Sequence, residues 1–132
     1  YAMGLGTAST NGLIIGGDTG SKVAITESWN GSSWTEVNDL NTARSTGNQS
    51  GTSTEGIVFG GYAATQVANT ESWNGTSWTE VADLATARYG LGGSTNGTTS
   101  LALAFGGYPG ALTATEEFTV PATVTNKTIT VS

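Results

Sequence analysis

Short apolar runs closed by paired glycines are the most regular feature of the hydrophobic pattern. The runs cover residues 13–15, 57–59 and 101–105, and the doublets that follow them are Gly16-Gly17, Gly60-Gly61 and Gly106-Gly107. A short, continuous apolar run between turn residues is typical of a strand buried on both faces. The pattern therefore predicts three buried strands, and no run approaches the roughly 18 apolar residues of a membrane span.

The polar segments between these runs repeat. Residues 26–44 and 70–88, which lie 44 residues apart, have the same 19-residue sequence except at three positions. A shortened third copy begins at Thr115 and places Phe118 where the other two have tryptophan. A period in the mid-forties with strand-forming residues indicates a propeller blade or a solenoid turn. We expect three units at residues 1–41, 42–85 and 86–132, the last with a divergent C-terminal strand.

Each unit is predicted to contain four strands. The first covers residues 1–8, 45–50 or 89–93, and the second is the apolar run. The third ends at Trp29 or Trp73, and the fourth covers residues 32–37 or 76–81. Asn-Gly between the last two is a strong signal for a two-residue hairpin turn. That turn would place Trp29 and Trp34 on one face as diagonal neighbours, available for packing against an adjacent unit.

The order of these features resembles the kelch repeat. The matching features are an apolar run, a glycine doublet, an aromatic residue that ends the third strand, a tryptophan in the fourth strand, and a closing Leu with Ala-Arg. The resemblance implies an all-β fold of kelch-like β-propeller blades: three four-stranded antiparallel blades, an incomplete ring per chain. It assigns blade packing to the three doublets and to Trp29, Trp34, Trp73 and Trp78.

Three blades cannot close a ring, because propellers typically have four to eight. Two copies of the chain would complete a six-bladed ring with two-fold symmetry. The alternative is that further blades belong to a longer chain. The sequence leaves both open.

Composition excludes several classes of function. Gly, Thr, Ser and Asn supply half of the 132 residues, yet 36% of the chain is hydrophobic, so we expect a folded protein. The net charge of −6, with four scattered cations, argues against nucleic-acid binding. Cysteine and histidine are absent, which removes the usual metal ligands and the commonest general base. We therefore predict no enzymatic activity, cofactor, metal or membrane insertion.

The acidic residues recur in register, for example Glu27, Glu71 and Glu116. A catalytic pair needs two carboxylates in different environments, whereas repeats supply similar ones. Turn capping, solvent exposure or pairing with Arg44 and Arg88 is the favoured interpretation.

The loops after the glycine doublets differ between units, as a recognition surface on a constant scaffold requires. They carry Asp18, Tyr62 and Tyr108, and the neighbouring connections carry Arg44 and Arg88. We predict that the tyrosines stack on sugar rings while the arginines donate hydrogen bonds. The alternative is that the tyrosines pack on their own blades and the arginines fix the blade junctions.

The near-identical Thr-, Asn- and Gly-rich units, and the tail at residues 124–131, also resemble repeats of bacteriophage fibre and virion-surface proteins. That resemblance implies a module of the virion surface, or an extracellular one, that binds host-surface glycan. A purely structural repeat that builds a fibre is the first alternative. A kelch-type protein-interaction adaptor is the second.

Overall fold

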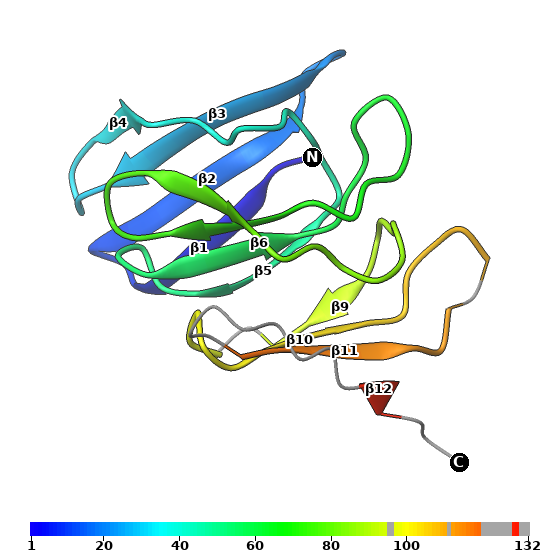
Figure 1. The fold of residues 1–132 in the computed structure, drawn as a ribbon. Helices are drawn as coiled ribbons and strands as arrows, with labels where there is room; N and C mark the ends of the chain where they lie inside the picture. The colour runs from blue at the N-terminus through cyan, green and yellow to red at the C-terminus, as the bar shows by residue number, and fades with distance from the viewer. Residues whose placement is uncertain (95–96, 111, 120–127, 130–132) are drawn as a thin grey trace.

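The computed structural model describes residues 1–94, 97–110, 112–119 and 128–129, and all regular secondary structure in them is β-strand (Figure 1). The strands form three antiparallel sheets of four strands each. The predicted all-β fold of three four-stranded sheets is therefore confirmed.

The strands of each sheet follow one another in chain order. The first sheet contains β1 (Met3–Ala8), β2 (Asn11–Asp18), β3 (Lys22–Trp29) and β4 (Trp34–Val37). The second contains β5 (Asn48–Gly51), β6 (Gly56–Phe59), β7 (Thr70–Trp73) and β8 (Trp78–Val81). The third contains β9 (Gly92–Gly93), β10 (Ala102–Phe105), β11 (Thr115–Phe118) and β12 (Thr128–Ile129). Each sheet lies within one of the three predicted units. The predicted tail at residues 124–131 lies outside the described residues except for β12.

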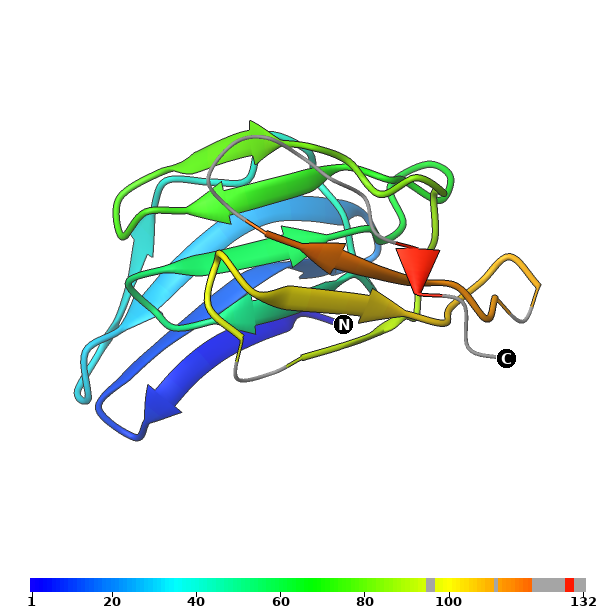
Figure 2. The ribbon, with the colours of Figure 1, turned by 60° about the horizontal axis from the view of Figure 1, so that its bottom comes forward.

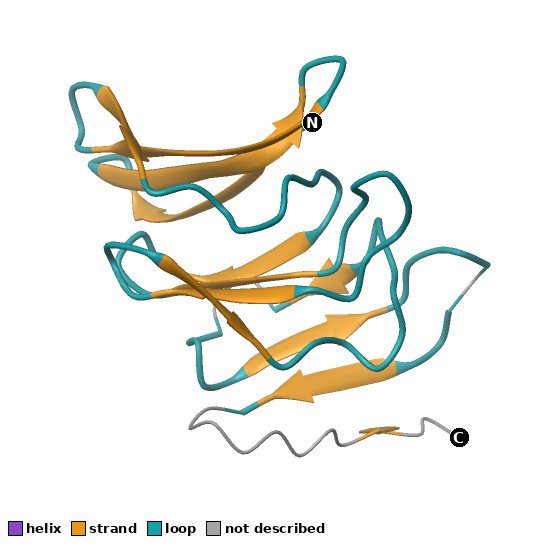
Figure 3. Cartoon of the chain, turned by 45° about the horizontal axis from the view of Figure 1, so that its top comes forward, coloured by secondary structure: helices purple, strands orange, loops and turns teal. Residues whose placement is uncertain are grey.

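The three sheets stack face to face, with the second between the other two (Figure 3). Their first strands are neighbours, because β1 lies beside β5 and β5 beside β9 (Figure 2). This is a propeller-like arrangement, and the described sheets do not close into a ring.

Two apolar cores fill the two junctions. We call the face of a sheet that points toward the next unit along the chain its front face, and the opposite face its back face. The first core joins the front face of the first sheet to the back face of the second, and its residues are Met3, Leu5, Leu13, Ile15, Leu40, Val58, Trp73 and Trp78. The second joins the front of the second sheet to the back of the third through Ile57, Phe59, Leu84, Leu91, Ala102, Ala104 and Phe118. The second strand of the middle sheet is buried on both faces, as its continuous hydrophobicity predicts. The same prediction was wrong for the apolar runs of the two outer sheets: Ile14 is 36% exposed, and Leu101 and Phe105 are 62% and 44% exposed, because each outer sheet is packed against a described sheet on one face alone.

The hairpin between the third and fourth strands is longer than predicted. Trp29 pairs directly with Trp34, and Trp73 with Trp78, so the loop has four residues and the two-residue turn was wrong. The Asn30 side chain is the reason: its Oδ1 accepts hydrogen bonds from the backbone N–H groups of Ser32 and Ser33, both at 2.9 Å. Asn74 makes the same two bonds in the second sheet. Only the glycine of each loop has a positive φ, +93°.

The four tryptophans form two similar pairs in different surroundings. The ring centroids lie 5.3 Å apart in the Trp29–Trp34 pair and 5.1 Å apart in the Trp73–Trp78 pair. Trp73 and Trp78 are buried against the first sheet, and the Trp78 indole N–H donates to the Thr26 hydroxyl at 3.1 Å. Trp34 instead remains 45% exposed on the back face of the first sheet, which no described residue covers.

The glycine doublets let two backbones approach closely. Gly16 and Gly60 have φ of +56° and +62°, a region that residues with a Cβ avoid. A Cβ at Gly60 would lie 2.6 Å from the carbonyl oxygen of Arg88, and one at Gly16 equally close to that of Arg44. Each doublet therefore allows the linker to the next sheet, residues 38–44 or 82–88, to approach closely.

We predict that Trp78→Ala lowers the free energy of unfolding by about 3–5 kcal/mol, because it empties part of a packed core. Trp34→Ala is the matched control, and it costs no more than about 1.5 kcal/mol because roughly half of this indole already lies in water. Urea unfolding measures both. Equal losses would contradict the assignment of the two faces.

We predict that Gly60→Ala lowers the free energy of unfolding by about 3 kcal/mol, from left-handed strain and overpacking against Arg88. Gly110→Ala isolates the strain, since Gly110 has a φ of +69° and a Cβ added there would meet nothing within 4 Å. It costs about 1–2 kcal/mol. A Gly60→Ala loss no larger than that of Gly110→Ala would show that the approach of the linker is not constrained.

Candidate functional site

An arginine ends the linker after each of the first two sheets, and its backbone belongs to the sheet just completed. Arg44 N–H donates to the Val23 carbonyl at 3.3 Å, and the Arg44 carbonyl accepts from Gly17 N–H at 2.9 Å. Arg88 makes the same two bonds with Val67 and Gly61, at 3.2 and 2.8 Å. The glycine doublet therefore fixes the arginine at the edge of its own sheet.

The arginine side chain crosses to the next sheet and meets a buried glutamate. Arg44 Nη2 lies 3.1 Å from Glu71 Oε1, and both side chains are fully buried. Glu71 Oε2 also accepts hydrogen bonds from the backbone and side-chain amides of Asn41, at 2.7 and 2.8 Å. The carboxylate thus holds both the arginine and the linker that carries it.

The second junction repeats the pair. Arg88 Nη2 donates to Glu116 Oε1 at 2.6 Å, and the Ala85 N–H donates to Oε2 at 2.7 Å. Arg88 Nη1 donates to the Ala114 carbonyl at 3.0 Å, as Arg44 Nη1 does to Asn69 at 3.2 Å. Pairing of the repeated acids with arginine, the interpretation favoured from the sequence, is present at both junctions.

Burial shapes the electrostatics of this pair. Loss of solvent lowers the pKa of Arg44, and the negative charge of Glu71 opposes that effect. An arginine keeps its proton at neutral pH even so. Because both guanidiniums are buried in the junctions, neither presents a donor to a ligand at the surface, and we leave Arg44 and Arg88 out of the candidate binding surface.

Three tyrosines from separate loops gather at one end of the stack. The Tyr62 and Tyr89 rings meet edge to face with centroids 5.4 Å apart, and Tyr89 stacks on Tyr108 at 5.7 Å. Lys22 Nζ lies 5.6 Å from the centre of the Tyr62 ring. The cluster spans all three sheets, because Tyr62 follows β6, Tyr89 precedes β9 and Tyr108 follows β10, while Lys22 belongs to β3.

A pocket of about 340 Å³ opens beside this cluster. Its lining residues are Tyr1, Asp18, Lys22, Ser45, Thr46, Tyr62 and Tyr89. Lys22 Nζ donates to Asp18 Oδ2 at 2.5 Å, and this bond, together with the Gly20 N–H, lowers the pKa of Asp18. The pocket therefore combines aromatic faces with a charged pair.

The structure brings together some of the predicted ligand residues and adds others. Asp18 and Tyr62 line the pocket, and Tyr108 extends the cluster beyond Tyr89. Sequence reasoning missed Tyr1, Lys22 and Tyr89. A signal existed for two of them: Tyr1 and Tyr89 hold the same register, at the start of a unit's first strand.

Other site types find no support in the described part of the chain. It contains no group of three acidic, histidine or cysteine side chains placed to hold a metal ion. It also contains no helix long and apolar enough to cross a membrane.

No protein-family model matches the sequence, and a search of curated proteins finds no match.

We predict that Glu71→Gln lowers the free energy of unfolding by about 3–5 kcal/mol, because it leaves the buried Arg44 charge uncompensated. Glu27→Gln is the matched control in the same register, and we expect a change within about 0.5 kcal/mol. Glu27 is half-buried and makes no ion pair with any described residue. Chemical denaturation compares the two, and equal effects would mean that the junction charge does not stabilise the fold.

Proposed function

We propose that this chain is a non-enzymatic, propeller-type module of an exposed surface that binds host-surface glycan through the tyrosine cluster. The clustering of Tyr62, Tyr89 and Tyr108 beside the Asp18–Lys22 pair carries the proposal. A virion surface or tail fibre is the proposed location, on the resemblance of the repeats to phage fibre proteins.

The chemistry of the cluster suits a sugar ring. A pyranose has apolar C–H faces and a rim of hydroxyls, so it matches an aromatic face flanked by polar groups. Tyr108 is 57% exposed and Tyr1 90% exposed, which leaves ring surface for such stacking. Asp18 and Lys22 provide an acceptor and a donor at the edge of the same pocket.

Variation between units adds support. The glycine doublets and the arginine linkers are nearly constant, whereas the loops that supply the tyrosine cluster differ in sequence. Binding residues on variable loops held by a rigid scaffold are a common arrangement in recognition proteins.

A role in assembly is the second candidate function. The back face of the first sheet exposes Ile14, Ile25 and Trp34, at 36%, 41% and 45%. Large apolar side chains grouped on one face favour contact with another protein surface. The adaptor function expected from the kelch resemblance stays a prediction, since no particular residue favours it.

An array of bacterial surface polysaccharides tests glycan binding. We expect the chain to bind at least one polysaccharide, and Tyr108→Ala to weaken that binding about tenfold, a loss of about 1.4 kcal/mol. Trp34→Ala is the control, because it removes an aromatic ring of similar exposure away from the cluster. Absence of binding to every polysaccharide, or equal loss in both variants, would contradict the proposal and favour the structural role.

A further inference from the structure

The back face of the first sheet repeats a surface that is covered in the second sheet. Ile14, Glu27 and Trp34 are equivalent to Val58, Glu71 and Trp78, 44 residues later. The first set is exposed or half-buried, whereas the second is buried beneath the neighbouring sheet. The sequence thus builds a docking surface of this kind in each of the three sheets, around Glu27, Glu71 and Glu116, and the described residues cover it only in the second and third.

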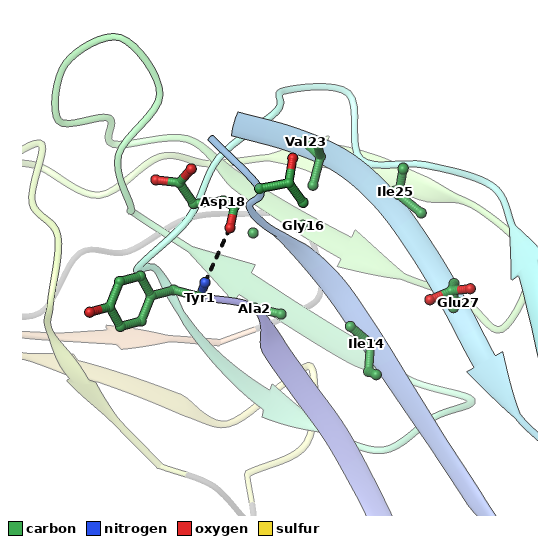
Figure 4. A pocket seen from close by; sticks show the side chains of 10 residues that line it. Tyr1, Ala2, Ile14, Gly16, Asp18, Val23, Ile25 and Glu27 are labelled. Atoms are coloured by element: carbon green, nitrogen blue, oxygen red, sulfur yellow. Dashed lines mark hydrogen bonds between the residues drawn. The ribbon is translucent and has the colours of Figure 1, made fainter. Parts of the chain in front are cut away.

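A pocket of about 250 Å³ lies on this face, where a junction arginine would fit. Glu27, Ile25, Val23 and Ile14 form its floor, and Tyr1 with Gly16 borders it (Figure 4). In the second sheet the Arg44 guanidinium binds the carboxylate of Glu71 and the carbonyl of Asn69. Glu27 and Ile25 are the equivalents of these two residues, and both line the pocket.

The register of Tyr1 identifies where that arginine would come from. A Cβ at Gly17, Gly61 or Gly107 would lie 2.5, 2.7 or 2.9 Å from the carbonyl oxygen of Tyr1, Ser45 or Tyr89, respectively. These three residues are therefore equivalent. Ser45 and Tyr89 each follow directly after an arginine of a junction. Tyr1 borders the pocket in the corresponding place.

We propose that the back face of the first sheet binds one further repeat unit, whose closing arginine occupies the position before Tyr1 and pairs with Glu27. The unit's front face would cover Ile14 and Trp34, as the front face of the first sheet covers Val58 and Trp78. Charge complementarity and apolar contact both specify this partner. The proposal is independent of glycan binding at the tyrosine cluster.

A second copy of the described residues is a poorer occupant. Arg44 and Arg88 are buried in the junctions of their own chain, and Lys22 is engaged by Asp18. None of these cations is free to enter the pocket at Glu27 without breaking an existing junction or pair.

Cysteine labelling tests the proposal, because the chain has no cysteine of its own. The test protein carries a copy of residues 1–44 joined directly to Tyr1, together with Ile14→Cys in the original first sheet. We expect a maleimide to label this cysteine at least about tenfold more slowly than in the chain without the added unit, since Val58, its covered equivalent, is fully buried. Thr35→Cys is the control, because Thr35 follows Trp34 on the opposite face of the sheet and its equivalent Thr79 is also exposed.

Two variants test the proposed pair between Glu27 and the closing arginine of the added unit. Replacing the copied Arg44 by Met in the added unit, or Glu27 by Gln, is expected to restore at least about tenfold faster labelling at position 14. The copied Leu40→Ala serves as a second variant that weakens the apolar contact while leaving the charges in place.

Three results would overturn the proposal. The first is equal labelling of Ile14→Cys with and without the added unit, while far-ultraviolet circular dichroism shows that unit to be folded. The second is protection that is unaffected by both charge variants. The third is concentration-dependent protection in the original chain, with a dimer in sedimentation, which would make a second copy the occupant.

Discussion

The arginine–glutamate pair that crosses each sheet junction is the interaction on which the rest of the structure depends. One residue belongs to two sheets: the backbone of Arg44 is bonded to the first, and its guanidinium meets Glu71 in the second. Removing two charges from water costs free energy that an apolar contact of the same size does not. Such a pair therefore adds little to the net free energy of folding, and its main effect is to favour one arrangement of the two sheets over others. A slipped junction would leave both charges buried and unpaired, and stacking in the observed register is the arrangement that avoids this.

Much of the repeated sequence serves to place that arginine. Asp39 accepts the Thr26 N–H at 3.1 Å, and Leu40 N–H donates to the Ala24 carbonyl, so the linker runs along the third strand of its own sheet. The glycine doublet then lets the arginine carbonyl approach. Asp83, Leu84 and Gly60 have the same roles one unit later. The abundance of glycine, threonine and asparagine thus has a positional cause in turns, linkers and strand faces.

The repeat and the doublets were enough to predict the number of sheets and the residue at which the third strand ends, Trp29 or Trp73. The hairpin length was not predictable from Asn-Gly alone, because the Asn30 side chain caps two following amides and lengthens the loop. Blade packing was expected of all four tryptophans. Trp34 and Trp78 differ because burial depends on the neighbouring unit, which the local sequence does not specify. The tyrosine cluster joins residues far apart in the chain, so its members could be suspected singly but not assembled. The residue type of Arg44 and Arg88 was compatible either with hydrogen bonding to a ligand or with fixing the blade junctions. The burial of both side chains favours the junction role.

A double-mutant cycle between Arg44 and Glu71 measures whether the two charges recognise each other across the junction. The free energy of unfolding would be measured for the parent chain, Arg44→Met, Glu71→Gln and the double variant. We expect a coupling of about 2–3 kcal/mol, with the double variant more stable than Glu71→Gln alone, because removing both charges leaves none buried without a partner. Losses that add to within about 0.5 kcal/mol would show that the two charges do not recognise each other across the junction.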